Sequence, residues 1–105
     1  MERIGLSTSD WKVSGLMART FTDRLLGMWR APAGSAVVIP ARSVHSFGRR
    51  LPLEVVGLDT GMRVVATRTL HPNRAIVIRT ARMIVELPAG HPLPARGDRV
   101  ELTHE

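Results

Sequence analysis

The stretch Glu54–Thr69, EVVGLDTGMRVVATRT, has the clearest β-pattern in the chain. Two runs rich in β-branched residues flank Asp59-Thr60-Gly61, and a polar, glycine-containing turn between two such runs is typical of a β-hairpin. Runs of the same kind recur on both sides: SAVVIP (35–40), AIVIRT (75–80), ARMIVELP (81–88) and RVELT (99–103). Short apolar runs separated by turn residues predict a mostly antiparallel sheet, with the doubly apolar SAVVIP at its centre.

The N-terminal third adds one strand and one helix to this expectation. WKVSGLMA (11–18) has strand character that Gly15 weakens. In TFTDRLLGMW (20–29), Thr20 precedes Asp23 by three residues, as in a capping box, and the apolar residues fall on one helical face. We therefore predict a single α+β domain over residues 1–105: a β-rich small barrel, or a strongly curved and mostly antiparallel sheet, with one short helix.

Composition excludes several classes of site. The chain of 105 residues has no cysteine, which excludes disulfides, thiolate zinc sites, iron–sulfur clusters and a cysteine nucleophile. No apolar run has the length of a membrane span or an export signal, so we expect no membrane span and a cytoplasmic location. We expect no cofactor.

The net charge of +6 comes from 15 basic residues, of which only Lys12 is a lysine. A basic chain can bind nucleic acid through its phosphates. Here the arginines are spread along the whole sequence and aromatic residues make up only 4% of it, which leaves little for a base-stacking platform. These two features argue against nucleic acid as the partner, and weak nucleic-acid binding is kept as an alternative.

Three pieces of sequence in fixed order carry a family resemblance. They are ARTFTDRLLGM (18–28), HSFGRRLPLEVVGLD (45–59), and HPNR (71–74) followed by ARMIVELPAG (81–90) and GDRV (97–100). Together they resemble domain-of-unknown-function family 192, a family of small bacterial and archaeal domains. The resemblance implies a compact β-rich fold and supplies no function. The sequence departs from the family pattern at Arg49, where an apolar or small residue is usual, and at Glu54, where aspartate is usual.

The histidines do not form a recognisable catalytic or metal site. Ser43 and His45 lie two residues apart on a strand, so their side chains are roughly 7 Å apart, too far for a nucleophile–base hydrogen bond. No two histidines have the spacing of a metal-binding pair, and Arg49 and Arg50 would repel a cation. We therefore predict neither catalytic nor metal-binding residues.

The polar residues around the central motif are the candidate site. We predict that His45, Arg49, Arg50, Glu54 and Arg74 bind a ligand, because arginines with few neutralising acids suit an anion. Three further polar residues, Arg42, Asp59 and Glu86, are expected to have structural roles. The predicted function is a non-catalytic module for an anionic small molecule or a protein partner.

Two alternatives to this predicted binding function remain open. An enzyme could use His45 with Glu54 or Asp59 as an acid/base pair. Alternatively, the arginines could pair with Glu54 and Glu86 as a structural network, contributing about 0–1 kcal/mol per exposed pair.

Overall fold

The computed structural model describes residues 2–20 and 34–105, and within these ranges the protein is all-β. The nine strands are β1 (Glu2–Ser7), β2 (Lys12–Met17), β3 (Ala36–Ile39), β4 (Ser43–His45), β5 (Leu53–Leu58), β6 (Val64–Leu70), β7 (Ala75–Val77), β8 (Met83–Pro88) and β9 (Glu101–His104). The predicted α+β class is therefore wrong for the described chain. The helix predicted in residues 20–29 lies, apart from Thr20, outside the described residues.

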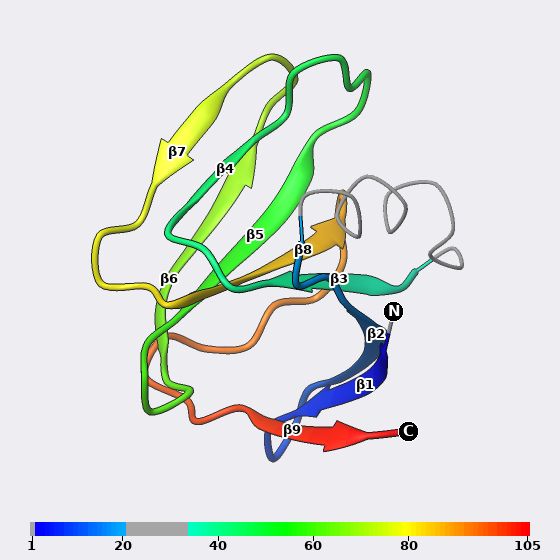
Figure 1. The fold of residues 1–105 in the computed structure, drawn as a ribbon, viewed down its shortest axis with the longest axis vertical. Coiled ribbons are helices and arrows are strands. Elements are labelled where there is room, and N and C mark those ends of the chain that lie inside the picture. The colour runs from blue at the N-terminus through cyan, green and yellow to red at the C-terminus, as the bar shows by residue number, and fades with distance from the viewer. Residues whose placement is uncertain (1, 21–33) are drawn as a thin grey trace.

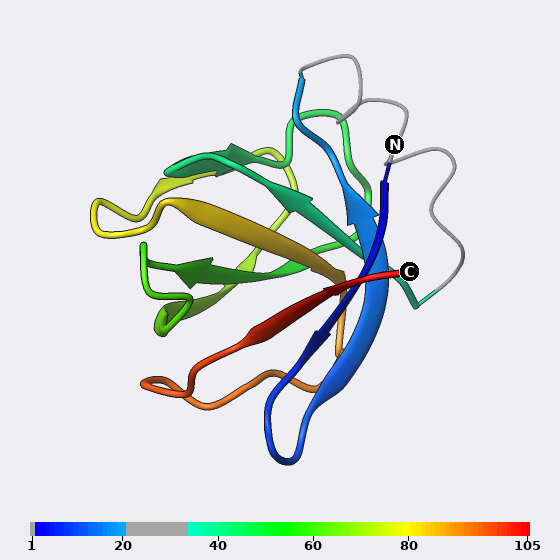
Figure 2. The same cartoon turned by 60° about the horizontal axis from the view of Figure 1, so that its bottom comes forward.

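Seven strands form one strongly curved sheet in the order β6-β5-β8-β3-β2-β1-β9, and β4 and β7 form a separate two-stranded sheet (Figure 1). Every pairing is antiparallel except β2 with β3, which run parallel. Figure 2 shows the curvature, with β1 and β2 (blue) and β9 (red) at one end of the sheet and β5 and β6 (green) at the other.

The large sheet does not close into a barrel, which corrects the barrel form of the prediction. Strands β6 and β9 are the two edges of this sheet. The segment that precedes β9 meets the segment that precedes β6 at one isolated bridge, between Arg99 and Arg63. Around this bridge Val64 N donates to Asp98 O at 2.9 Å, and Val100 N donates to Met62 O at 2.8 Å. One bridge in place of a full ladder leaves the two edges open.

Each face of the curved sheet carries its own apolar cluster. The inner face packs residues such as Leu6, Val38 and Val85, and the outer face packs residues such as Ile39, Val55 and Ile84 against β4 and β7. Strand β8 contributes alternately to the two clusters, with Ile84 in the outer one and Val85 in the inner one. Strand β3 is buried along its whole length and is the fourth of seven strands, which confirms the central position predicted for SAVVIP.

The predicted strands differ from the observed ones at β1 and at β7. Strand β1 was not predicted, because its apolar pattern consists only of Ile4 and Leu6 with a glycine between them, and glycine weakens strand character. Only the first half of AIVIRT is strand β7, since the chain turns after Ile78 with Ala81 N donating to Ile78 O at 3.0 Å. Within the described ranges, no helix is long and apolar enough to cross a membrane.

Candidate functional site

The central motif forms strand β4, which pairs with β7 on the outside of the large sheet (Figure 1). Val44 lies opposite Ile76, and both pack inwards onto the outer apolar cluster. Because strand side chains alternate between faces, Ser43, His45 and Val77 stand on the opposite face and are exposed. The two strands thus form a thin layer with one face buried and the other in solvent.

An aromatic pair lies on the exposed face of the β4–β7 layer. The rings of His45 and Phe47 are stacked, with centroids 4.9 Å apart and planes at 21°. Phe47 is 61% exposed, although phenylalanine is usually buried. The sequence signal for this pair is the alternation in SVHSF: once Val44 points inwards, His45 and Phe47 share the outer face.

The same layer concentrates positive charge. Residues 41–52 and 71–82, here called the basic sheet, contain no aspartate or glutamate. Their arginines are Arg42, Arg49, Arg50, Arg74, Arg79 and Arg82. Within the described chain none of these six forms an ion pair, since the two pairs found there join Glu2 to Arg19 and to His104. The two paired segments therefore carry six arginines that have no ion-pair partner among the described residues.

Ser46 fixes the end of β4 to the loop that precedes β7. Its buried hydroxyl donates to His71 O at 2.6 Å and accepts from Arg74 N at 3.0 Å. The Ser46 backbone N–H also donates to Arg74 O at 2.8 Å. These bonds satisfy the backbone where the short β4–β7 ladder ends, and they explain why a serine is buried at this position.

Asn73 completes this connection from the other side. Its φ of 58° is in the left-handed region, which asparagine tolerates better than most residues. Asn73 Oδ1 accepts from Gly48 N at 3.0 Å, and Asn73 N donates to Ser46 O at 3.1 Å. The loop that carries Phe47 and Arg49 is thus held by backbone contacts on both sides.

Arg49 is half-buried, and its Nε is a buried donor without a hydrogen-bond partner. A buried donor left unpaired costs about 1–3 kcal/mol, so such groups are uncommon in native proteins. The backbone N of Arg49 donates to Ser46 O at 3.1 Å, which sets the start of this side chain beside the Ser46 connection. Arg49 is also one of the two departures from the family pattern.

Glu54 does not join the arginines. It lies on β5, is 7% exposed, and accepts hydrogen bonds from Thr69 Oγ1 at 2.6 Å and from Gly90 N at 2.7 Å. The Thr69 hydroxyl, followed by the Gly90 amide, holds the pKa of the Glu54 carboxyl below its usual value against the opposing effect of burial, and nearby His71 adds to the lowering. Glu54 is therefore separated from the other predicted ligand-binding residues, because its carboxylate is hydrogen-bonded within the protein.

The remaining predicted residues take varied positions. Arg42, Arg50 and Arg74 are exposed, and no side-chain hydrogen bond from them to another described residue is found. Asp59 Oδ1 accepts from Gly61 N at 2.9 Å and from Arg63 N at 3.0 Å, which holds the β5–β6 turn. Glu86 is buried on β8 at 4% exposure. No group of three or more potential metal ligands occurs among the residues that the structure describes.

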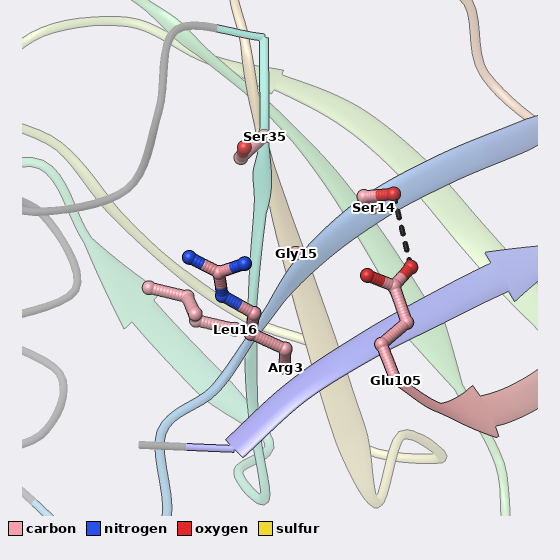
Figure 3. Close-up of a pocket in the computed structure, with 6 residues that line it drawn as sticks. All are labelled: Arg3, Ser14, Gly15, Leu16, Ser35 and Glu105. Carbon is pink, nitrogen blue, oxygen red and sulfur yellow. Dashed lines mark hydrogen bonds between the residues drawn. The ribbon is translucent and has the colours of Figure 1, made fainter.

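A separate small cavity of about 120 Å³ lies where β1 and β2 meet the C-terminal residue (Figure 3). Arg3, Ser14 and Glu105 line it with mixed charge, and Ser14 Oγ donates to Glu105 Oε1 at 3.1 Å. It contains none of the predicted site residues. We therefore place the candidate site on the exposed face of the basic sheet, which is a surface rather than a cavity.

Comparisons with known proteins bear on the fold. No family model matches the chain, so membership of family 192 is not confirmed, and no curated protein matches. Two solved structures are similar. One is a protein of unknown function from Novosphingobium aromaticivorans DSM 12444, with a TM-score of 0.70, 14% identity, and coverage of 94% of this chain and 83% of that one.

The second similar structure is a "putative transcription regulator" from Sinorhizobium meliloti 1021, with a TM-score of 0.71 and 21% identity. The match covers 95% of this chain and 92% of that one. At these identities the two likenesses show a shared fold over nearly the full length of the chain.

Proposed function

We propose that the protein is a non-catalytic binding module that takes an anionic ligand on the basic sheet. The observation that carries this proposal is the gathering of six arginines and no carboxylate in residues 41–52 and 71–82. Charges of one sign on one surface raise the potential there and attract ions of the opposite sign.

Arg49 supports the proposal independently. Its guanidinium keeps one buried donor unpaired, and an anionic oxygen is the acceptor that such a donor binds most strongly. The loop that carries it is already fixed by Ser46 and Asn73, so little ordering is needed when a ligand arrives.

The acid/base alternative is weaker on physical grounds. A general base is most effective when its pKa is near the working pH, whereas Thr69 and Gly90 lower the pKa of Glu54. Asp59 holds the β5–β6 turn through two backbone amides. His45 stacks on Phe47 and has no described hydrogen bond to a carboxylate.

Thermal unfolding with inorganic triphosphate as probe, at constant ionic strength against chloride, tests the proposal. At roughly ten times the Kd, linkage predicts a rise in Tm of roughly 5–10 °C for the wild type. We expect Arg50→Ala/Arg74→Ala to lose most of this rise. Arg49→Met should lose it too while folding at least as stably, because the unpaired donor is removed.

Arg96→Ala/Arg99→Ala is the matched control, since it removes the same charge from exposed residues outside the basic sheet. The control should keep the wild-type rise. Equal losses in the two double variants, or no rise with the wild type, would overturn the proposal.

A further inference from the structure

Exposed apolar side chains gather on the same surface as the arginines. Among the described residues, four large hydrophobic side chains are exposed: Phe47 at 61%, Leu51 at 69%, Val77 at 68% and Leu93 at 37%. The first three belong to the basic sheet. These two segments therefore expose both cationic and apolar side chains, and one of the apolar side chains is an aromatic ring.

The Phe47 ring is prepared for a further stacking partner. His45 covers one face of the ring at a centroid distance of 4.9 Å, and the large exposed fraction of Phe47 leaves the other face in solvent. Ser46, between them in sequence, is buried and hydrogen-bonded to the loop before β7, so the backbone that carries both rings is held in place. Aromatic pairs favour offset-stacked or edge-to-face arrangements, and an exposed ring face can take part in an offset stack.

We infer that the anionic ligand of the basic sheet is single-stranded nucleic acid, with a base stacked on Phe47 and phosphates bound by the surrounding arginines. The inference rests on the proposed function and narrows it to one class of ligand. Single strands combine both features found here, a charged backbone at regular spacing and free base faces. The arginines are scattered in the sequence, but the pairing of β4 with β7 places Arg42 beside Ile78 at one end of the ladder and Arg74 beside Ser46, near Arg49, at the other.

Duplex DNA and lipid surfaces fit the same residues less well. In a duplex the base faces are stacked on one another, so Phe47 would meet only the sugar–phosphate backbone or a groove. Insertion of Phe47 into a lipid surface would carry the polar ring nitrogens of His45 with it, and unpaired polar groups are costly in an apolar medium.

Fluorescence anisotropy with labelled oligothymidine and oligouridine of about 12 nucleotides tests the inference, at several salt concentrations. Phe47→Leu retains apolar area but removes the ring, so we expect about 5- to 100-fold weaker binding with an unchanged salt dependence. Phe47→Trp should bind at least as tightly as the wild type. Leu93→Ala, a matched exposed apolar change outside the basic sheet, should have no effect.

Substitution of the arginines, in contrast, should change how strongly the binding constant depends on salt concentration. Each phosphate contact on a single strand contributes about 0.7 to the slope of log K against log salt concentration, so Arg50→Ala/Arg74→Ala should reduce the slope by about 1.4. Arg96→Ala/Arg99→Ala should leave it unchanged.

Three results would overturn the inference: equal binding of wild type and Phe47→Leu, equal or tighter binding of a duplex, or binding to phosphatidylserine vesicles without oligonucleotide binding. A Tm response to triphosphate without any oligonucleotide binding would refute the inference and leave the proposed function standing. Loss of both responses would refute the two together.

Discussion

Three buried or half-buried polar residues, Ser46, Arg49 and Glu54, lie within nine positions of one another and differ in how their polar atoms are satisfied. Ser46 and Glu54 are fully engaged with backbone and side-chain partners, so each holds a loop in place. Arg49 keeps one buried donor unpaired. Since burial of a polar group is favourable only with a partner, the unsatisfied residue is where a ligand would add stability.

Glu54 makes stability depend on pH. Its pKa is lowered in the folded state, so its contribution is complete above the unfolded pKa, near 4.5, and is lost as pH falls through the folded value. We expect Glu54→Gln to lower the free energy of unfolding by about 1–3 kcal/mol at pH 7 and to flatten its decline in acid. Urea unfolding between pH 7 and acid pH measures both.

The exposed Glu101→Gln should keep the wild-type stability at pH 7 and its decline in acid. A residual decline should remain in Glu54→Gln, because a hydrogen bond from His104 also lowers the pKa of Glu2. An unchanged acid profile in Glu54→Gln would show that the Thr69 and Gly90 contacts do not hold the charged carboxylate.

At the scale of the elements, the parallel β2–β3 pair depends on one close approach. A Cβ at Gly15 would lie 2.4 Å from Ala36 O, a backbone atom of the neighbouring strand. The glycine that weakens the strand character of WKVSGLMA is thus required by packing. The parallel β2–β3 pair and the β4–β7 layer both depend on contacts between segments that are distant in the chain.

Gly15→Ala should therefore destabilise the protein by at least about 2 kcal/mol, because the two strands must separate to admit the methyl group. Gly61→Ala is the control, since its Cβ would meet only the Asp59 carboxylate at an ordinary 3.4 Å. Chemical denaturation of both variants gives the comparison. A cost for Gly15→Ala within about 0.5 kcal/mol of the control would contradict this account.

Among the described residues, the exposed acids lie away from the basic sheet, in the company of the exposed bases Arg3, Lys12 and Arg19. The basic sheet has no acidic residue, while the exposed acids Glu2, Asp10, Glu101 and Glu105 lie on or beside β1, β2 and β9. Repulsion within the basic sheet opposes its folding, and dissolved ions screen it. The surface proposed for binding is thus also a source of electrostatic strain.

Salt should consequently stabilise the protein. Raising sodium chloride from ~0.05 to ~0.5 M shortens the screening length to a few ångströms, so we expect a higher Tm for the wild type. Arg50→Ala/Arg74→Ala should have a higher Tm at low salt and a smaller rise, whereas Arg96→Ala/Arg99→Ala should retain the wild-type rise. A wild-type Tm that is constant or falls with salt would contradict this effect of repulsion within the basic sheet.

Sequence periodicity determined the strands with the clearest patterns. The β5–β6 hairpin, the central β3 and the two-faced β8 follow from alternation and turn residues, which act over a few positions. The short apolar pattern of β1 and the early end of β7 escaped prediction, because Gly5 lowers the strand propensity of β1 and the turn from Ile78 to Ala81 contains no glycine, proline or asparagine. The charge of the candidate site, with its arginines and scarcity of acids, was likewise visible in the sequence.

The contacts between strands that are distant in the chain were visible only in the three-dimensional structure. Strands β6 and β9 do not close a barrel because a single bridge between Arg63 and Arg99 stands in place of a ladder, and no local pattern encodes this. The separation of Glu54 from the arginines depends on Thr69 and Gly90, residues 15 and 36 positions away. The sequence determined which residues could bind an anion, and long-range strand pairing decided which of them share a surface, because such contacts depend on the whole chain rather than on neighbouring residues.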